Sequence, residues 1–217
     1  MKKRIISFSL WGNNPIYNIG AIKNAGLAKE IYPDWTCRYY LGKSVPLETT
    51  QQLIKFDNTE IFIMNDFGNW TGMFWRFYPA SDSDVSVMIS RDADSRLNWR
   101  EKEAVDEWLS SDKAFHVMRD HPFHTTEILG GMWGVRNHFL RDMKHLVNKY
   151  VKGDFWQVDQ NFLKEVVYPI VKDNALVHDE FFEKKQFPSK RKNKLFVGQA
   201  FNPNDTPLVP EHMDLII

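Results

Sequence analysis

The feature that most constrains the fold of this chain is a regular alternation of short apolar segments with longer amphipathic ones. Segments such as Arg4–Leu10, Thr36–Leu41 and Asp84–Ser90 have the length and the apolar alternation typical of strands. The segments between them have the apolar spacing of helices. Repeated strand–helix alternation favours a largely parallel sheet with helices on both faces. The sequence therefore predicts a single α/β domain.

The expected elements follow one another without an internal repeat, a low-complexity segment or a linker. The pair Asn14-Pro15 is a typical cap-then-proline start, and we expect this first helix to end near Ile31. The other expected helices are Pro46–Phe56, Trp70–Ala80, Asn98–Ser110, Phe139–Lys152 and Gln157–Tyr168. The other expected strands are Glu60–Met64, Ala114–Met118, a short one entered through Gly130-Gly131, and Ala175–Val177.

Composition excludes several classes of function. The 28 acidic and 28 basic residues cancel, so bulk charge gives no indication of binding to nucleic acid or to an anionic membrane. No apolar run approaches the ~18 residues of a membrane span, and no signal peptide is visible. A lone Cys37 excludes an internal disulfide framework and favours a reducing compartment. We therefore expect a cytoplasmic protein in which residues 1–217 form one domain, alone or at the N-terminus of a longer chain.

Two carboxylates follow the apolar strand that ends at Ser90. Asp92 and Asp94 are two residues apart, so in extended chain their side chains point to the same side. Carboxylate oxygens without nearby cysteine suit Mg²⁺ or Mn²⁺. Arg91 and Arg96 flank the pair and could neutralise an anion beside the metal. Because turns are rich in Asp for backbone reasons, a purely structural role stays open.

Polar residues gather where the expected strands end. In open parallel sheets ligands bind at the carboxyl ends of the strands. The segments at these ends are Ser9-Leu10-Trp11-Gly12, Asn65-Asp66, Asp92-Ala93-Asp94 and Arg119-Asp120-His121. Because these ends meet at one edge of the sheet, the sequence predicts a polar cleft there.

Three further features each have a structural and a functional interpretation. Gly130-Gly131 would let a ligand approach the backbone, or would form a tight turn packed under Trp133. Asp159 lies in the first turn of an expected helix, where Asp is commonly a cap. His116, His121 and His124 could suggest zinc. However, Pro122 interrupts their spacing, which favours loop histidines or acceptor contacts.

The ordered set of motifs resembles that of the GT-A nucleotide-sugar glycosyltransferases. Within this superfamily the chain is most similar to the small chlorella-virus-type domain implicated in capsid glycan synthesis. The resemblance covers about residues 4–198. The motifs that carry it are Met73-Phe74-Trp75-Arg76-Phe77, Asp92-Ala93-Asp94, Gly130-Gly131, Asp159-Gln160 with Phe162-Leu163, and Val177-His178-Asp179.

The resemblance implies roles for the acidic motifs. Asp94 would ligate Mn²⁺ or Mg²⁺, with Asp92 on the metal or on the donor ribose. His178 would complete the metal shell, although an isolated histidine of this kind is more often a loop residue. Asp159 and Gln160 match the pair that lies near the reacting sugar carbon.

The same resemblance implies how the nucleotide is held. Ser9, Leu10, Trp11 and Arg76 match positions that hold the base and ribose or orient the donor. The aromatic and small-polar end of the first strand suits a stacked uracil, so we expect a UDP-sugar. The cations expected to meet the diphosphate are Lys190, Arg191 or Lys194. The Gly-x-Lys-Pro-Trp signature of glycogenin-like relatives is absent, which leaves the choice among these cations open.

The expected activity is metal-dependent transfer of a hexose from a UDP-sugar to a glycan or protein-linked sugar acceptor. A divalent cation would stabilise the leaving diphosphate, and a carboxylate such as Asp159 beside the anomeric carbon would favour retention of configuration. An inverting enzyme would need a base instead, for which Asp120, Asp159 or His121 are candidates.

Two alternative functions stay open at this stage. One is a non-catalytic domain that binds a nucleotide-sugar or carbohydrate. The other is a phosphatase of the haloacid-dehalogenase type, which uses the first Asp of Asp-x-Asp as nucleophile. That motif normally follows the first strand, whereas Asp92 follows about the fourth.

Overall fold

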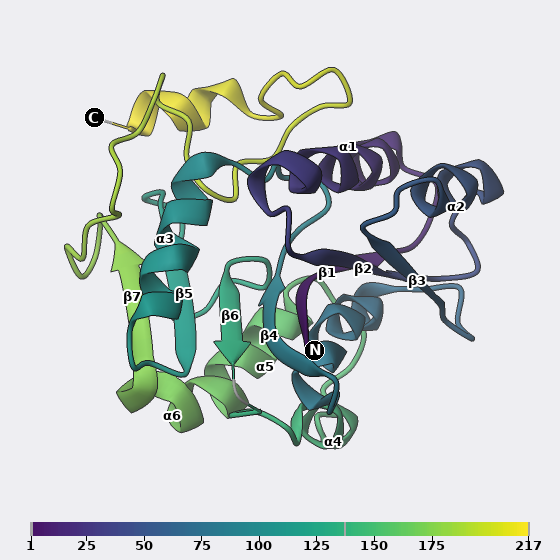
Figure 1. Cartoon of the computed structure of the whole chain (residues 1–217), viewed down its shortest axis with the longest axis horizontal. Helices are drawn as coiled ribbons and strands as arrows, with labels where there is room; N and C mark the ends of the chain where they lie inside the picture. The colour runs from purple at the N-terminus through teal and green to yellow at the C-terminus, as the bar shows by residue number, and fades with distance from the viewer. Residues whose placement is uncertain (1, 137, 217) are drawn as a thin grey trace.

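Seven strands form one sheet in the order β3-β2-β1-β4-β6-β5-β7 (Figure 1). This arrangement comes from a computed structural model that describes residues 2–136 and 138–216. All neighbouring strands are parallel except that β6 runs antiparallel to β4 and β5, so the expected mostly parallel sheet is confirmed. The strands are β1 (Lys3–Leu10), β2 (Thr36–Leu41), β3 (Thr59–Ile63), β4 (Val85–Ser90), β5 (Phe115–Arg119), β6 (Trp133–Arg136) and β7 (Ala175–Asp179).

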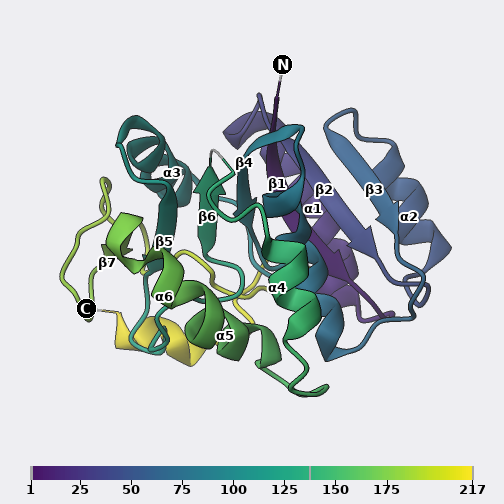
Figure 2. The same cartoon turned by 90° about the horizontal axis from the view of Figure 1, so that it is seen from below.

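Helices cover both faces of this sheet (Figures 1 and 2). The α-helices are α1 (Pro15–Ile31), α2 (Leu47–Ile54), α3 (Trp99–Ser110), α4 (Met143–Lys149), α5 (Val158–Phe162) and α6 (Tyr168–Val171). The remaining helical segments are the 3₁₀ helices η1 (Trp70–Ser81), η3 (Lys172–Asn174) and η4 (Pro210–Leu215) and the π turn η2 (Leu163–Val167). No helix of the described residues has both the length and the apolarity to cross a bilayer.

Successive apolar side chains of the central strands point to opposite faces of the sheet, so each face has its own core. On β4, Met88 packs into the cluster that contains Phe77 of η1 and Phe162 of α5. Its neighbour Ile89 points to the other face, into the cluster that contains Trp108 of α3. Because both faces are covered, β4 is almost entirely buried, as central parallel strands usually are.

The segment expected as a helix over Trp70–Ala80 is helical but of the 3₁₀ type. Two backbone positions explain this. The Arg76 amide donates to Ser9 Oγ at 2.9 Å, and Pro79 has no amide hydrogen to donate. The Ser9 contact fixes η1 against the end of β1, which directs the Arg76 side chain to the carboxyl edge of the sheet.

Two other helices differ from expectation in their bounds. The helix expected over Phe139–Lys152 is shorter, because Phe139 and Arg141 form turns that donate to Arg136 and His138 before α4 begins. The helix expected to end before Pro169 instead continues to the end of α6. The π turn η2 makes this possible because its wider hydrogen bonds accommodate a residue that lacks an amide hydrogen.

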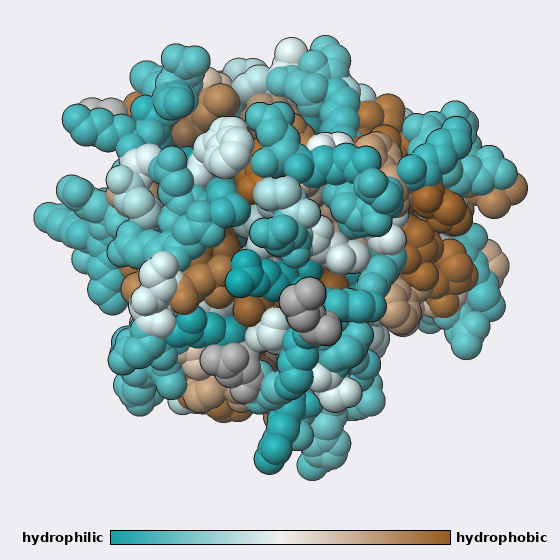
Figure 3. Space-filling view, in the orientation of Figure 1, coloured by the Kyte–Doolittle hydropathy of each residue, from teal (hydrophilic) through white to brown (hydrophobic). Residues whose placement is uncertain are grey.

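The chain after β7 has little regular structure and lies along the carboxyl edge of the sheet. In Figure 1 it passes α3 and ends in η4, on the same side of the sheet as α1. Phe201 N donates to the Asp94 carbonyl at 2.9 Å, which joins this segment to the loop after β4. Most of the face in Figure 3 is polar, and an apolar area covers the end formed by α2 and β3, where Leu47, Ile54 and Ile63 are exposed.

Candidate active site

A cleft of about 450 Å³ opens at the carboxyl ends of β1 and β4. Its volume lies within the ~300–1,000 Å³ that ligand pockets usually have. The predicted residues that line it are Ser9, Leu10, Trp11, Arg76, Asp92, Asp94 and Gln160. Three aromatic residues that the sequence did not single out also line it, namely Tyr17, Trp70 and Trp156.

The Arg76 guanidinium is the centre of a buried ion-pair network beside this cleft. Its Nη1 lies 2.8 Å from Asp92 Oδ1, and its Nη2 lies 2.7 Å from Asp159 Oδ2. Asp159 is fully buried. It does not cap α5, because Gln157 occupies the N-cap position of that helix. Burial raises the pKa of Asp159, and the Arg76 charge opposes that rise. Asp159 therefore contacts Arg76 and is not among the residues that line the cleft.

Gly130 and Gly131 make room for this network. A Cβ atom at Gly130 would overlap Arg76 Nη2 and Asp159 Oδ2, and one at Gly131 would overlap Asp92 Oδ2. The two glycines therefore let the cleft's own side chains approach the backbone. The side chains that use this space in the structure are those of Asp92, Arg76 and Asp159.

We expect Gly131→Ala to displace Asp92, because the added methyl group would also meet the Asp92 backbone nitrogen. Overpacking of this kind costs about 1–3 kcal/mol of stability. The metal and nucleotide binding expected from the sequence, measured with UDP by calorimetry, should weaken by about tenfold or more, since the Asp92 carboxylate would move. Gly26→Ala in α1 is the control, because its Cβ would make only an ordinary contact with Phe56. Unchanged UDP binding in Gly131→Ala would contradict the account.

Asp94 differs from Asp92 in having no partner. Among the described residues, no side chain donates a hydrogen bond to the Asp94 carboxylate or forms an ion pair with it. Burial raises the pKa of Asp94 to about 7, and the charge of nearby Asp92 contributes. Two close carboxylates, one of them costly to ionise, form a site whose free energy falls when a cation binds.

These residues fit Mg²⁺ or Mn²⁺. Such ions commonly use one or two carboxylates and complete their coordination with water and phosphate oxygens. Within residues 2–136 and 138–216, no group of three or more His, Cys, Asp or Glu side chains gathers as a metal cage. Asp92 and Asp94 are the residues that would hold such an ion.

The end of β1 forms an aromatic wall of the cleft. Trp11 packs edge-to-face on Trp70, with ring centroids 6.2 Å apart. Ser9 Oγ accepts from the Arg76 amide and lies 3.5 Å from the Met73 carbonyl, so its hydroxyl holds η1 in place. The wall thus offers aromatic surface next to the two carboxylates.

His178 is not brought to these carboxylates, which corrects the expected three-residue metal shell. Its Nδ1 lies 2.8 Å from His116 Nε2, its Nε2 lies 3.5 Å from Glu107, and its ring packs against Phe187. It lies in β7, one residue before the end of the strand. This strand is three strands away from β4, which is about 14 Å at the usual strand spacing. Burial lowers the pKa of both histidines, so the pair is held neutral inside the fold.

Arg191 and Asp120 also have other partners. The Asp120 carboxylate is fully buried, where it accepts from Arg100 Nε at 2.9 Å, from Arg191 Nη2 at 2.5 Å and from the Val197 amide at 2.9 Å. Arg191 also pairs with Glu180 at 2.8 Å. Asp120 is thus not available as a base, and Arg191 is not among the residues that line the cleft.

The other basic and histidine candidates are likewise placed outside the cleft. Lys194 does not line it. His121 Nε2 lies 2.9 Å from the His212 carbonyl, and His124 Nδ1 accepts from the Asp120 amide. Burial lowers the pKa of His124 to about 3, which keeps it neutral. Both histidines form hydrogen bonds with backbone atoms, in agreement with their interpretation as ordinary loop residues.

The two arginines that flank the carboxylates have structural partners too. Arg91 is buried and its Nε lies 3.1 Å from Glu101, while Arg96 Nε lies 2.9 Å from Asp205. Arg96 Nη1 also donates to the Asp94 carbonyl at 3.2 Å, but neither arginine lines the cleft, and Arg76 is the cation that pairs with an Asp-x-Asp carboxylate. The sequence position of Arg91 and Arg96 was misleading because Glu101 and Asp205 are their carboxylate partners.

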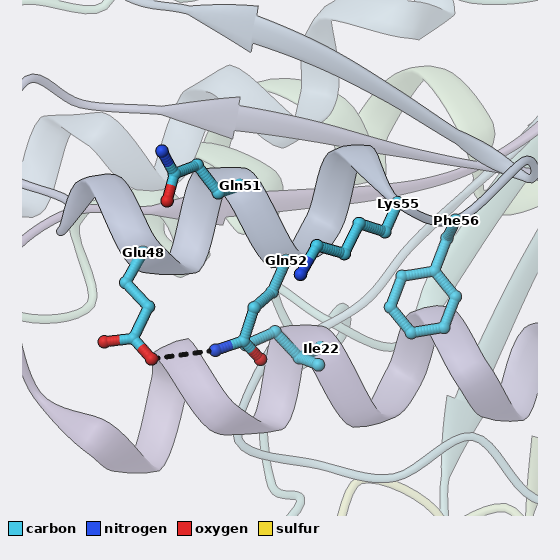
Figure 4. Close-up of a pocket in the computed structure, with 6 residues that line it drawn as sticks. All are labelled: Ile22, Glu48, Gln51, Gln52, Lys55 and Phe56. Atoms are coloured by element: carbon cyan, nitrogen blue, oxygen red, sulfur yellow. Dashed lines mark hydrogen bonds between the residues drawn. The ribbon is translucent and has the colours of Figure 1, made fainter.

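A further cavity of about 380 Å³ lies between α1 and α2 (Figure 4). Its one carboxylate, Glu48, accepts from Gln52 at 3.2 Å, and Ile22, Lys55 and Phe56 supply much of the remaining lining. It has no pair of carboxylates and none of the residues that end a strand. We therefore take the cleft beside β1 and β4 as the candidate active site.

No protein-family model matches the sequence, and neither does any curated protein. Solved structures do resemble it. A glycosyltransferase involved in glycosylation of the major capsid of PBCV-1 shares 17% identity over 82% of each chain, with a TM-score of 0.55. The mannosyltransferase PcManGT from Pyrobaculum calidifontis, in complex with GDP-Man and Mn²⁺, shares 10% identity and a TM-score of 0.55, with 82% of this chain and 55% of that one covered.

The same architecture also serves another class of enzyme. The 4-diphosphocytidyl-2C-methyl-D-erythritol synthase from Anaerococcus prevotii shares 8% identity and a TM-score of 0.51, over 88% of this chain and 94% of that one. At these identities the similarity defines the fold. The expected architecture is confirmed: GT-A glycosyltransferases are among the structural neighbours, and the chain itself has the GT-A fold.

Proposed function

We propose that this protein is a glycosyltransferase that transfers a hexose from a UDP-sugar to a glycan or protein-linked sugar acceptor, with Mn²⁺ or Mg²⁺ as cofactor and with retention of configuration. The observation that carries the proposal is Asp94, a carboxylate without a side-chain partner whose pKa is raised to about 7 beside Asp92. Such a group favours a divalent cation, and the cleft around it has the size of a nucleotide-sugar site.

In this proposal Asp94 and Asp92 hold the metal, which when bound neutralises charge that develops on the leaving diphosphate. Arg76 fixes Asp92 and brings a positive charge to the same region. The Trp11 and Trp70 wall stacks on the base, and Ser9 holds the η1 backbone beneath it. None of the cleft-lining residues is a lysine, so Arg76 replaces Lys190, Arg191 and Lys194 as the proposed cation near the phosphates.

Asp159 and Gln160 take separate roles. Gln160 lines the cleft, where its amide can hydrogen-bond the donor sugar. Asp159 is a positioning residue that acts through Arg76, because its carboxylate is fully buried and paired at 2.7 Å.

The alternatives receive less support. A phosphatase of the haloacid-dehalogenase type normally carries its Asp-x-Asp motif after the first strand, whereas Asp92 follows β4. A non-catalytic binding domain would bind UDP with metal yet release no sugar. A screen of UDP-sugars for metal-dependent donor hydrolysis separates this case from an enzyme, and lack of turnover with every donor would contradict the proposal.

The identity of the nucleotide base is tested by thermal-shift titration with UDP, GDP, CDP and ADP in the presence of Mn²⁺. We expect the largest stabilisation with UDP, since at a fixed ligand concentration the gain in stability increases as the dissociation constant falls. GDP is an important arm because PcManGT was solved with GDP-Man. CDP is another because the synthase from Anaerococcus prevotii is named for a diphosphocytidyl compound. A preference for either would overturn the uracil assignment.

Manganese binding should depend on pH in a defined direction. The metal needs ionised Asp94, whose pKa is raised to about 7, so Mn²⁺ must displace a proton below that value. We expect affinity to fall by about tenfold per pH unit below about 7 and to level off above it. Electron paramagnetic resonance of free Mn²⁺ measures this directly. Constant affinity between about pH 5 and 8 would show that Asp94 is not a titrating ligand.

A further inference from the structure

A separate cavity of about 300 Å³ lies at the start of α3, against the chain after β7. It shares no lining residue with the cleft beside β1 and β4. The loop that carries Asp94 separates the two sites. Arg96 Nη1 and Phe201 N, which belong to residues that line this cavity, each donate a hydrogen bond to the Asp94 carbonyl. The cavity thus lies directly behind the loop that carries the metal carboxylates.

The charge of this cavity is positive. Its two arginines are neutralised, Arg96 by Asp205 and Arg100 by Asp120 and Glu180. Lys190 and Lys192 also line it, and neither forms an ion pair with any residue that the structure describes. The one acidic residue of the lining is Glu103, which leaves an excess of positive charge.

The remaining lining suits a sugar ring. Trp99 is 53% exposed and, within the described chain, its ring stacks on no other aromatic side chain. The Ser189 hydroxyl is buried and has no hydrogen-bond partner. Leu195, Phe196 and Phe201 complete an apolar surface. An open indole face, an unused hydroxyl and two free ammonium groups together match a ring that carries hydroxyls and a negative charge.

We propose that this cavity binds an anionic sugar, a hexuronate or a sugar phosphate, as part of the acceptor glycan. The acceptor assignment rests on the proposed function, whereas the binding site itself does not. Lys190 and Lys192 would pair with the carboxylate or phosphate, Trp99 would stack on the ring, and Ser189 would bond a hydroxyl. Because no lining residue belongs to the metal site, binding here requires neither metal nor nucleotide.

The test is a titration of the uniformly ¹⁵N-labelled protein, without metal or nucleotide, followed at the Trp99 indole NH, which Trp99→Phe assigns. The probes are glucose 6-phosphate, glucuronate, glucose and inorganic phosphate. We expect saturable shifts with the first two and affinities at least about tenfold above those for glucose or phosphate, since ring and charge contribute together. The affinity should fall with added salt.

Variants separate the possible origins of any shift. Lys190→Ala with Lys192→Ala should abolish the preference for charged sugars, while Lys149→Ala, an exposed lysine on α4, should leave it unchanged. Asp94→Ala should also leave it unchanged. No saturable shift, equal affinity for glucose, binding by phosphate alone, or loss of binding in Asp94→Ala would each overturn the inference. Intact UDP–Mn²⁺ binding in the same samples would then confine the failure to this site.

Discussion

Replacing Asp94 by asparagine is expected to abolish sugar transfer and to make the folded protein more stable above pH 7. The loss arises because the substituted amide does not carry the charge that holds a divalent cation, and removal of metal assistance costs at least about 10³ in turnover. The gain arises because ionised Asp94 is unfavourable in the fold, where burial and Asp92 raise its pKa to about 7. The measurements are donor hydrolysis and chemical unfolding at several pH values.

The sign of the stability change follows from proton linkage. A carboxyl whose folded pKa is raised binds its proton more tightly in the native state, so its ionisation destabilises the fold as pH rises from about 4 to about 7. Asparagine does not ionise, so above that pH range the free energy of unfolding of the variant should exceed that of the unmodified protein by on the order of 1 kcal/mol, after allowance for partial solvent exposure. Near pH 4 the two should be equal. Asp112→Asn, an exposed residue between α3 and β5, is the control. Full activity in EDTA would contradict the metal assignment.

Replacing Asp159 by asparagine is expected to lower turnover by about 10²–10⁴, the range typical of positioned charged groups. The physical reason is indirect. Without the Asp159 charge, Arg76 loses one of the two carboxylates that fix it, and Asp92 loses its anchored partner. Stability should change much less than turnover, since burial raises the pKa of Asp159 against the charge of Arg76, and Arg76 keeps its pairing with Asp92. Single-turnover kinetics and thermal unfolding report the two effects.

A double-mutant cycle distinguishes positioning from direct chemistry. If Asp159 acts through Arg76, then Arg76→Lys and Asp159→Asn should cause similar losses, and the double variant should lose little more than either alone. Additive losses would mean that Asp159 contacts the substrate independently. A near-normal rate in Asp159→Asn would return the residue to a purely structural role.

The sheet and the Asp-x-Asp motif could be predicted because their signals are local. Alternating apolar residues define β4, and a polar pair directly after it falls at the carboxyl edge by geometry alone. Asp92 and Asp94 therefore lie in the cleft with Ser9 and Trp11 from the neighbouring strand β1. The type of helix was not predicted where a side chain accepts a hydrogen bond from a backbone amide, as Ser9 does from Arg76.

The partners of charged side chains could not be predicted from local sequence. Arg191 pairs with Asp120, 71 residues earlier in the chain, and Arg76 pairs with Asp159, 83 residues later. The resemblance implied His178 as a metal ligand, yet the pairing of β7 with β5 puts it beside His116. Spacing shows which residues can share an edge of the sheet, whereas tertiary packing decides which of them meet.

The buried carboxylate of Asp120 determines how the end of this protein can be altered. It draws Arg100 from α3, Arg191 and the Val197 amide onto a single anion, so the segment after β7 is fastened to the sheet by charge as well as by packing. A chain shortened before Val197 would leave that anion with one donor fewer in a water-free site. Fusion partners and affinity tags therefore belong beyond residue 197, where they leave this fastening intact.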